Sequence, residues 1–288
     1  MKKSLSIFVI VYSFLLTGCT REKDTVVTIR TKYGDMVAIL YDETPKHKAN
    51  FIKLAKEHFF DSLLFHRVIP GFMIQGGDPE SKHAPGNVSL GNGDPGYSID
   101  AEINPNYFHE KGALAAARLS DQQNPTKASN GSQFYIVQGN VMSEMSLKLD
   151  QEKFTAAFQQ LMQNPVHKPM FDSLTMIYQQ GDVTAYERYF NSLVPRVEKI
   201  TGSKVTRDID PLKVKAYTSV GGTPGLDGEY TVFGKVIRGL EVIDSIAKQP
   251  TQLDRPINDI RMEITVDEIP RKKITELYGF TYPEKTKN

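Results

Sequence analysis

The sequence contains no tryptophan, a single cysteine and almost no net charge, since 35 basic and 34 acidic residues leave +1. One cysteine excludes an intramolecular disulfide and a cysteine-rich zinc site. The balanced charge provides no overall field that would attract nucleic acid. Six histidines are scattered without the spacing of metal ligands, so we expect no metal and no cofactor. Any partner must therefore be recognised through local contacts.

Two common catalytic signatures are also missing. The glycine-rich stretch Gly91–Gly96 (GNGDPG) is not followed by a helix that carries a lysine, as a phosphate-binding loop requires. No Ser/His/Asp or Cys/His combination can be placed, which argues against a hydrolase. The chain of 288 residues, 40% of them hydrophobic, is nevertheless long enough to bury a large core.

The N-terminus has the pattern of a targeting segment. Basic residues precede the apolar run Leu5–Leu16, which is too short to span a bilayer and typical of a signal-peptide core. The run ends at Gly18-Cys19, which resembles a bacterial lipobox. This resemblance implies a lipoprotein signal peptide (1–18), a lipidated Cys19, a polar tether (19–25) and a lipid-anchored place in the bacterial cell envelope, in the periplasm or at the outer membrane. The alternative is an ordinary secretory signal with an incidental cysteine.

Strand patterns dominate two of the three regions that follow the tether. Residues 26–139 and 217–270 contain short alternating or apolar runs separated by glycine and proline, which predict a mainly β fold. Among these runs, Val26–Arg30 and Met36–Leu40 predict a hairpin, and Leu64–Ile69 predicts a further strand. Pro45 begins a helical stretch in the first of these regions, and Leu240–Lys248 forms a short helix in the second. The tail 271–288 shows no clear period and stays unassigned.

The region 140–216 differs from its neighbours. Glycine becomes rare there, and Phe154, Phe158 and Leu161 recur at helical spacing. Such spacing of large apolar side chains is typical of a helix that packs on a core. We therefore predict an inserted α-helical module with a small core of its own.

The stretch Phe65–Asp78 (FHRVIPGFMIQGGD) sets Arg67 among apolar residues, with Gln75 eight positions later. A guanidinium keeps its charge and its planar set of donors, so placing it in an apolar wall costs free energy unless acceptors surround it. This pattern indicates a functional arginine. The alternative is an arginine whose aliphatic stem packs on the core while its head reaches water.

Three further segments accompany this stretch: Gly112–Arg118 (GALAAAR), Asn130–Val137 (NGSQFYIV) and Gly225–Val236 (GLDGEYTVFGKV). The small side chains of the first segment would let a ligand approach the backbone. Strand alternation in the second puts Gln133 and Tyr135 on one face.

In this order the segments resemble the cyclophilin family of peptidyl-prolyl isomerases, over about 26–139 and 217–269. The resemblance implies a closed eight-stranded antiparallel β-barrel capped by two helices, here with the helical module inserted. It implies proline-containing polypeptides as substrates, and no metal or cofactor.

The family motifs also imply the site residues. Arg67 and Gln75 correspond to the catalytic arginine and to a residue that orients it. Substrate-binding positions are His66, Phe72, Met73, Ala117, Arg118, Gln133, Tyr135, Leu226 and Tyr230. A lone histidine such as His66 is also compatible with a purely structural role. Many eukaryotic members carry tryptophan at Gly225, histidine at Tyr230 and phenylalanine at Tyr135.

The expected function is isomerisation of X–Pro bonds in exported proteins. A proline-peptide-binding or chaperone module with incidental catalysis is the alternative, and replacement of Arg67 separates the two. Residues 140–216 have two possible roles: they wall one side of the groove and select larger substrates, or they are an insertion tolerated because its ends are close in space. The oligomeric state stays open.

Overall fold

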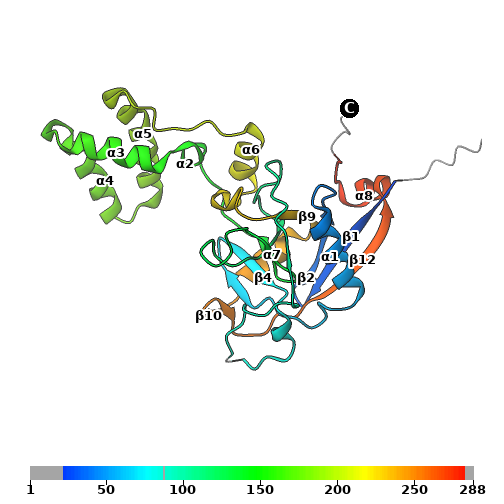
Figure 1. The fold of residues 1–288 in the computed structure, drawn as a ribbon. Coiled ribbons are helices and arrows are strands. Elements are labelled where there is room, and N and C mark those ends of the chain that lie inside the picture. Colours follow the sequence, from blue (N-terminus) through cyan, green and yellow to red (C-terminus); the bar gives the residue numbers. More distant parts are fainter. Residues whose placement is uncertain (1–21, 87, 283–288) are drawn as a thin grey trace, which may run out of the picture.

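The computed structural model describes residues 22–86 and 88–282. Its centre is an eight-stranded antiparallel sheet with the order β12-β1-β2-β9-β6-β8-β4-β3 (Figure 1). The strands are β1 (Lys23–Thr31), β2 (Gly34–Leu40), β3 (Arg67–Ile69), β4 (Met73–Gly76), β6 (Ala113–Ala116), β8 (Phe134–Val137), β9 (Val232–Arg238) and β12 (Glu263–Pro270).

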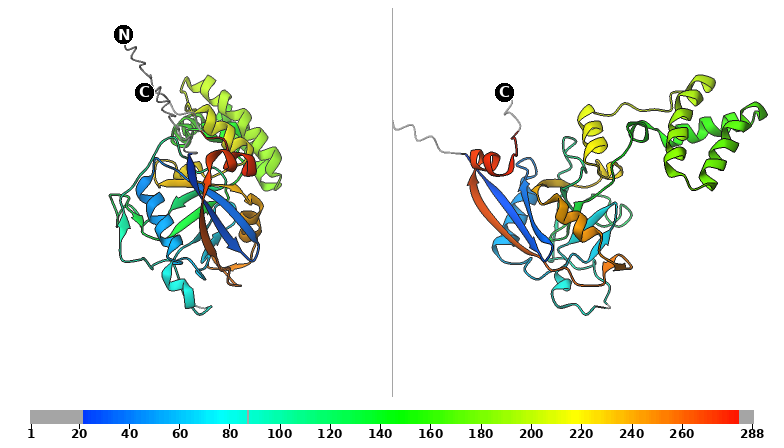
Figure 2. Two further views of the ribbon diagram at one scale, coloured as in Figure 1. Left: turned by 90° about the vertical axis from the view of Figure 1, so that its right-hand side faces the viewer. Right: turned by 180° about the vertical axis from the view of Figure 1, so that it is seen from behind.

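The hairpin predicted near the N-terminus is confirmed as β1 and β2. Its turn contains Gly34 at φ +126°, a backbone conformation that L side chains rarely adopt. Alternation turns Val27 and Ile29 into the core, where both are fully buried. Strand β12 pairs with β1 along its whole length, and Figure 2 shows these two long strands side by side. This pairing joins the first and the last strand of the sheet in sequence order.

The sheet does not close into a continuous barrel, which corrects the closed barrel expected from the sequence. No ladder joins its edge strands, β3 and β12, in the described part of the chain. Only the segments that precede them meet, through a bridge between Leu64 and Arg261. The Phe65 amide N–H also donates to the Ile260 carbonyl at 2.9 Å. The strand predicted from Leu64 therefore begins at Arg67, because the residues before it make isolated contacts.

Helices α1 (Pro45–Lys56) and α7 (Leu240–Ala247) pack on this sheet. Pro45 occupies the first turn of α1, where its missing N–H costs nothing. Phe51 from α1 and Ile243 from α7 belong to the same buried cluster as Phe134 of β8. Both predicted helices thus contribute to one hydrophobic core.

The middle region is helical, as predicted. It contains α2 (Glu144–Lys148), α3 (Gln151–Met162), α4 (Lys168–Gln179), α5 (Val183–Thr201) and α6 (Pro211–Ser219). We call α3–α5 the helical module; they stand apart from the sheet, whereas α6 lies next to it (Figure 1). The module has a separate core formed by Leu149, Phe154, Ala157, Leu161, Phe171, Val194, Val197 and Val205.

Two antiparallel chain segments connect the module to the rest of the protein. Residues 148–150 run beside 205–207, and the Asp150 N–H donates to the Val205 carbonyl at 2.8 Å. We call this pair of segments the neck. Closer to the sheet, Asn140 and Gly222 form an antiparallel bridge. The chain therefore leaves the sheet and returns to it at neighbouring points.

Short elements complete the fold: 3₁₀ helices η1 (Pro79–His83), η2 (Pro165–His167) and η3 (Pro224–Leu226), strands β5 (Ser98–Ile99), β7 (Ser129–Asn130), β10 (Thr251–Gln252) and β11 (Arg255–Pro256), and helix α8 (Arg271–Tyr278). Helix α8 occupies the tail left unassigned, and its Ile274 is fully buried.

At the N-terminal end, β1 begins at Lys23, inside the segment predicted as a tether, and Asp24 is buried there. The predicted signal peptide 1–18 and Cys19 lie outside the described residues. In the ranges that the structure describes, no helix is both long and apolar enough to cross a bilayer.

Candidate active site

A row of residues crosses the sheet on its outer face. Arg67 on β3 lies opposite Gln75 on β4, Gln75 lies opposite Tyr135 on β8, and Tyr135 lies opposite Ala115 on β6. Directly paired residues of antiparallel strands point to the same side. The neighbour Phe134 points into the core instead, as the predicted alternation requires. Strand pairing alone therefore brings Arg67, Gln75 and Tyr135 to one surface.

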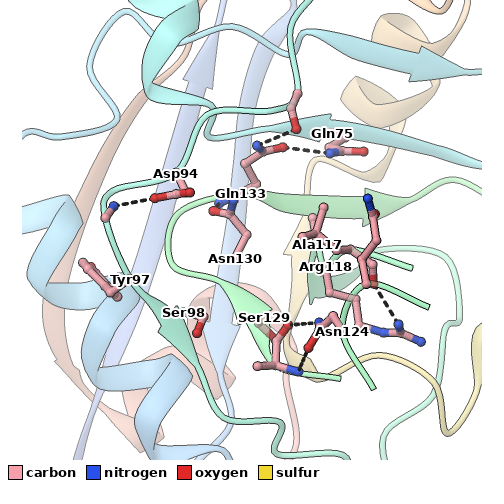
Figure 3. A pocket seen from close by; sticks show the side chains of 15 residues that line it. Gln75, Asp94, Tyr97, Ser98, Ala117, Arg118, Asn124, Ser129, Asn130 and Gln133 are labelled. Atoms are coloured by element: carbon pink, nitrogen blue, oxygen red, sulfur yellow. Dashed lines mark hydrogen bonds between the residues drawn. The ribbon is translucent and has the colours of Figure 1, made fainter. Parts of the chain in front are cut away.

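A chain of hydrogen bonds holds the arginine. The Arg67 Nη1 donates to Gln75 Oε1 at 3.2 Å, and Gln75 Nε2 donates to Gln133 Oε1 at 3.0 Å. Gln133 Nε2 in turn donates to the carbonyls of Gly91 and Gly93 at 3.0 and 2.7 Å. Figure 3 shows the two glutamines side by side, with Gln133 directed toward this loop. The glycine-rich stretch, which has no phosphate-binding context, thus fixes Gln133 through its backbone.

The guanidinium itself lies at the rim of the sheet. The Arg67 side chain is 44% exposed, and its Nε lies 3.6 Å from Asp254 Oδ2. The sequence had led us to expect that an apolar wall would enclose this guanidinium, and the structure does not show such an enclosure. One of its donors is held by Gln75 while much of the side chain faces solvent.

Apolar residues gather beside this row. Met73 and Tyr135 are buried in one cluster, and Phe72, Leu226 and Tyr230 pack against it half-buried. They come from the turn between β3 and β4, from β4, β8 and η3, and from the loop that follows η3. All five were predicted as substrate-binding positions, and the structure brings them together.

A cavity of about 440 Å³ opens on the side of the two glutamines (Figure 3). Its lining includes Gln75, Gln133, Ala117 and Arg118, together with residues of 91–98 and 123–130. A second hollow is lined by Arg118, Leu226 and Tyr230. Arg118 therefore stands between the two hollows.

The two residues that follow β6, Ala117 and Arg118, differ in their main-chain hydrogen bonds. Ala117 donates its N–H to the Gln133 carbonyl at 3.0 Å and accepts from the Asn130 N–H at 2.8 Å. The Arg118 main-chain N–H and carbonyl make no hydrogen bond to any residue that the structure describes. Arg118, and not Ala117, thus offers a free backbone edge.

The Arg118 side chain has a structural role that sequence reasoning missed. It is only 4% exposed, and its donors reach the Glu229 carbonyl at 2.9 Å and Asp121 Oδ1 at 2.6 Å. Its guanidinium also stacks over Tyr230, 4.5 Å from the ring centroid. Asp121 lies only three positions after Arg118, but Glu229 and Tyr230 are distant in the sequence and meet it only through the fold.

His66 does not join the apolar cluster. It is 3% exposed, and neither of its ring nitrogens has a hydrogen-bond partner among the described residues. Burial lowers the pKa of His66 to about 4, while the nearby Asp78 carboxylate opposes this effect. Its ring lines a separate cavity that it shares with Arg67 and Asp254. This geometry favours the structural interpretation of His66.

Two residues near the site were not predicted. His109 is fully buried, and its Nε2 lies 2.9 Å from the Tyr135 hydroxyl. Its other ring nitrogen, Nδ1, lies 3.2 Å from Asp227 Oδ1. Asp227 falls within a quoted motif but carried no assigned role, and His109 belongs to no motif.

Within the described residues, no group of three or more histidine, cysteine, aspartate or glutamate side chains is placed to hold a metal ion. The groups assembled here are hydrogen-bond donors, aromatic rings and a free backbone edge. They are suited to binding and polarising an extended peptide.

Comparison with known proteins adds to this picture. A family model described as cyclophilin type peptidyl-prolyl cis-trans isomerase/CLD matches residues 26–163 and 213–266. A relative from Staphylococcus saprophyticus, whose name assigns it to the peptidyl-prolyl cis-trans isomerases, is 30% identical over 237 residues, covering 82% of this chain and 87% of its own. A Streptococcus pyogenes protein, named as a bifunctional phosphatase/peptidyl-prolyl cis-trans isomerase, is 32% identical, but the alignment spans only 37% of its length.

Among solved structures, a cyclophilin type peptidyl-prolyl cis-trans isomerase from Cryptosporidium parvum has a TM-score of 0.49 and 22% identity, covering 86% of this chain and 100% of that one. The family model alone matches more than half of the chain, and its match is interrupted between residues 163 and 213, inside the inserted region. The chain therefore belongs to the family of cyclophilin-type peptidyl-prolyl cis-trans isomerases, as the order of its motifs had predicted.

Proposed function

We propose that this chain isomerises X–Pro bonds in exported polypeptides, with Arg67 donating a hydrogen bond to the prolyl nitrogen. The observation that carries the proposal is the chain of hydrogen bonds from Arg67 through Gln75 to Gln133, next to the apolar cluster around Tyr135. It places an oriented cation at the edge of a surface suited to a proline ring.

The reaction requires only a rotation. The planar imide loses its resonance as it turns, and uncatalysed exchange takes tens to hundreds of seconds. An enzyme accelerates this step by binding the twisted state more tightly than either planar isomer. In the twisted state the prolyl nitrogen regains a lone pair, so a donor aimed at it stabilises the transition state selectively.

Arg67 suits this task because its charge is permanent and its five N–H donors lie in one plane. Gln75 occupies one donor and restrains the plane, which leaves others for the substrate. Gln75 is itself fixed, because its amide donates to Gln133. The donor is thus oriented before the substrate arrives.

The neighbouring residues hold the substrate. Phe72, Met73, Tyr135 and Leu226 offer an apolar surface for the proline ring. The free main-chain N–H and carbonyl of Arg118 suit pairing with an extended peptide. Ala117 does not offer the same pairing, because its N–H and carbonyl are already hydrogen-bonded within the protein.

The place of action follows from the N-terminal pattern. We propose that Cys19 is lipidated and holds the protein at the bacterial cell envelope, in the periplasm or at the outer membrane. The lipobox-like Gly18-Cys19 and the apolar run before it support this. Substrates would then be polypeptides that have crossed the inner membrane.

Replacement of Arg67 tests the mechanism. In an exchange assay on an Ala-Pro peptide, Arg67→Ala should lower kcat/KM by about 100- to 1,000-fold, as loss of a preorganised donor does. Arg67→Lys should recover little, because an ammonium lacks the planar set of donors. The matched control Arg188→Ala, on the exposed side of α5, should behave as wild type.

Peptide affinity separates this function from the alternative. If Arg67 acts mainly in the transition state, the Kd of Arg67→Ala for the peptide should change by less than about threefold. Full activity of Arg67→Ala would refute the mechanism. A wild-type protein that binds the peptide without accelerating exchange would identify a binding or chaperone module instead.

A further inference from the structure

A chain of buried polar contacts lies beneath the apolar cluster. The Tyr135 hydroxyl lies 2.9 Å from His109 Nε2, and His109 Nδ1 lies 3.2 Å from Asp227 Oδ1. The same carboxylate oxygen accepts from the His109 main-chain N–H at 2.9 Å. Tyr135 belongs to the surface proposed for the proline ring, whereas His109 and Asp227 lie behind it.

The far end of this chain of contacts is held by helix α6. The Tyr217 hydroxyl donates to Asp227 Oδ1 at 2.8 Å, and Lys213 Nζ donates to Oδ2 at 3.0 Å. The loop after α6 contacts His109 as well, because the Thr223 N–H donates to the His109 carbonyl at 2.8 Å. At Gly222 an added Cβ would lie 2.3 Å from that carbonyl, so only glycine fits. Helix α6 is also the element through which the helical module returns to the sheet.

The chemistry of the carboxylate determines which atom donates in the first of these hydrogen bonds. An ionised carboxylate only accepts, so Asp227 requires the proton of His109 on Nδ1. The second ring nitrogen, Nε2, then faces the Tyr135 hydroxyl and shares a hydrogen bond with it. Burial raises the pKa of Asp227, but the hydrogen bonds from His109, Lys213 and Tyr217 outweigh it and hold that pKa below its ordinary value. The carboxylate therefore stays charged and keeps Nδ1 of His109 directed at it, so that Nε2 faces the Tyr135 hydroxyl.

Aromatic contacts hold the same ring from the other side. The rings of Tyr230 and Tyr135 are nearly perpendicular, with centroids 5.8 Å apart, and Arg118 stacks over Tyr230. The hydroxyl fixes the ring along its long axis, while Tyr230 limits its tilt. A phenylalanine at 135 would keep the second restraint and lose the first.

We propose that His109 and Asp227 are positioning residues that fix the Tyr135 ring for the substrate proline, and that α6 completes this network through Tyr217 and Lys213. The inference rests on the proposed function and deepens it. It gives the region between the module and the sheet a role in setting the proline site. It also explains why a tyrosine at 135 is compatible with an apolar subsite: its hydroxyl is satisfied behind the surface.

The test is a double-mutant cycle with Tyr217→Phe and Tyr135→Phe, read as kcat and KM on an Ala-Pro peptide. Tyr217 lies outside the apolar cluster, and Tyr217→Phe removes only the hydroxyl that donates to Asp227. We expect Tyr217→Phe to lower kcat about three- to tenfold with little change in KM, because a displaced ring misplaces the imide relative to Arg67. In the Tyr135→Phe background the same change should alter kcat less than 1.5-fold.

A matched control is Tyr189→Phe, which removes the hydroxyl that donates to the Met170 carbonyl inside the module. It should leave kcat and KM unchanged. Equal loss in Tyr189→Phe and Tyr217→Phe would overturn the proposal, as would an additive cycle or a fully active Tyr217→Phe. Each of these results would mean that the ring is positioned without α6.

A second readout does not depend on activity. In protein carrying ring-¹³C tyrosine, the Tyr135 resonance is assigned by its absence in Tyr135→Phe. Tyr217→Phe should shift this resonance and Tyr189→Phe should not. A wild type without isomerase activity would refute the proposed function while this spectrum still decides the network; an unshifted Tyr135 resonance in an active enzyme would refute the network alone.

Discussion

Arg67 illustrates what could and could not be predicted at the scale of single residues. Its motif identified the residue and its partner Gln75, because both positions fall within the motif Phe65–Asp78. The motif did not reveal that the guanidinium lies at the rim of the sheet, 44% exposed and close to Asp254. Asp254 lies far away in the sequence, so only the tertiary structure brings it near.

His109 shows the opposite case. It is buried, contacts the site through Tyr135, and has no signal in the sequence beyond being a histidine. Its partner Asp227 is 118 positions away in the chain. Contacts of this kind depend on strand pairing and loop geometry. A local pattern of residues does not predict which distant side chains these features bring together.

The buried His66 predicts acid sensitivity. Its pKa of about 4 lies below the ordinary value of 6.5, so between these two pH values the unfolded chain binds a proton that the folded chain does not. The free energy of unfolding should therefore fall as the pH is lowered through this window, by up to roughly 3 kcal/mol at its acid end.

Urea unfolding measured between pH 7 and pH 4 checks this. His66→Gln should flatten the pH dependence, whereas His58→Gln, at a side chain that is mostly exposed, should leave it as in wild type. The same slope in His66→Gln and wild type would show that another group causes the acid loss.

At the scale of elements, long regular segments were predicted best. The β1–β2 hairpin and helices α1 and α7 appear where alternation, Pro45 and helical spacing placed them. The strand expected over Leu64–Ile69 shrank to β3, because the residues before it meet the segment before β12 only at isolated points. Helix α8 was missed, since its charged sequence hides the single position, Ile274, that it buries.

The helical module is separable by its packing. Its buried cluster shares no residue with the core of the sheet, and its chain ends meet at the neck. None of the residues that line the cavities described above comes from 140–216. The hypothesis that this region walls the groove therefore finds no support in the lining of the site.

Removing the module should leave the enzyme working on small peptides. The variant replaces residues 151–204 by a short Gly/Ser linker and changes Leu149 and Val205, the two buried core residues outside this range, to serine. Because α6 is kept, we expect kcat/KM on an Ala-Pro peptide within about twofold of wild type, and a thermal melt that still shows cooperative unfolding.

A parallel assay on the refolding of a proline-limited protein decides the role of the module. Selective loss on the protein substrate would support a role in substrate choice. Unchanged activity on both substrates would identify a tolerated insertion. More than tenfold loss on the peptide would contradict the independence of module and sheet.

At the scale of the whole molecule, the family order of the motifs predicted an eight-stranded antiparallel arrangement, and the sheet has eight strands. The predicted closure of the barrel was wrong, because no ladder joins β3 to β12 in the described residues and only the segments before them meet, at the bridge between Leu64 and Arg261. Closure depends on the register of the segments before Arg67 and Glu263, which no sequence motif specifies.

Lipid attachment makes a prediction for the whole protein. Since Cys19 is the only cysteine, any lipid group attached through a cysteine sulfur must be on it. In a bacterial host, wild type should incorporate radiolabelled palmitate and sediment with membranes. Cys19→Ser should lose the label and appear in the aqueous fraction, while Thr20→Ala should behave as wild type. A membrane-bound, unlabelled Cys19→Ser would disprove the anchor.

The early start of β1 limits how far such an anchor lets the enzyme move. Cys19 lies four positions before Lys23, where the pairing with β12 begins. Four residues span at most about 14 Å when fully extended. A lipidated enzyme would consequently work within a thin layer above the headgroups, scanning the plane of the bilayer in two dimensions and serving only chains that pass close to that surface.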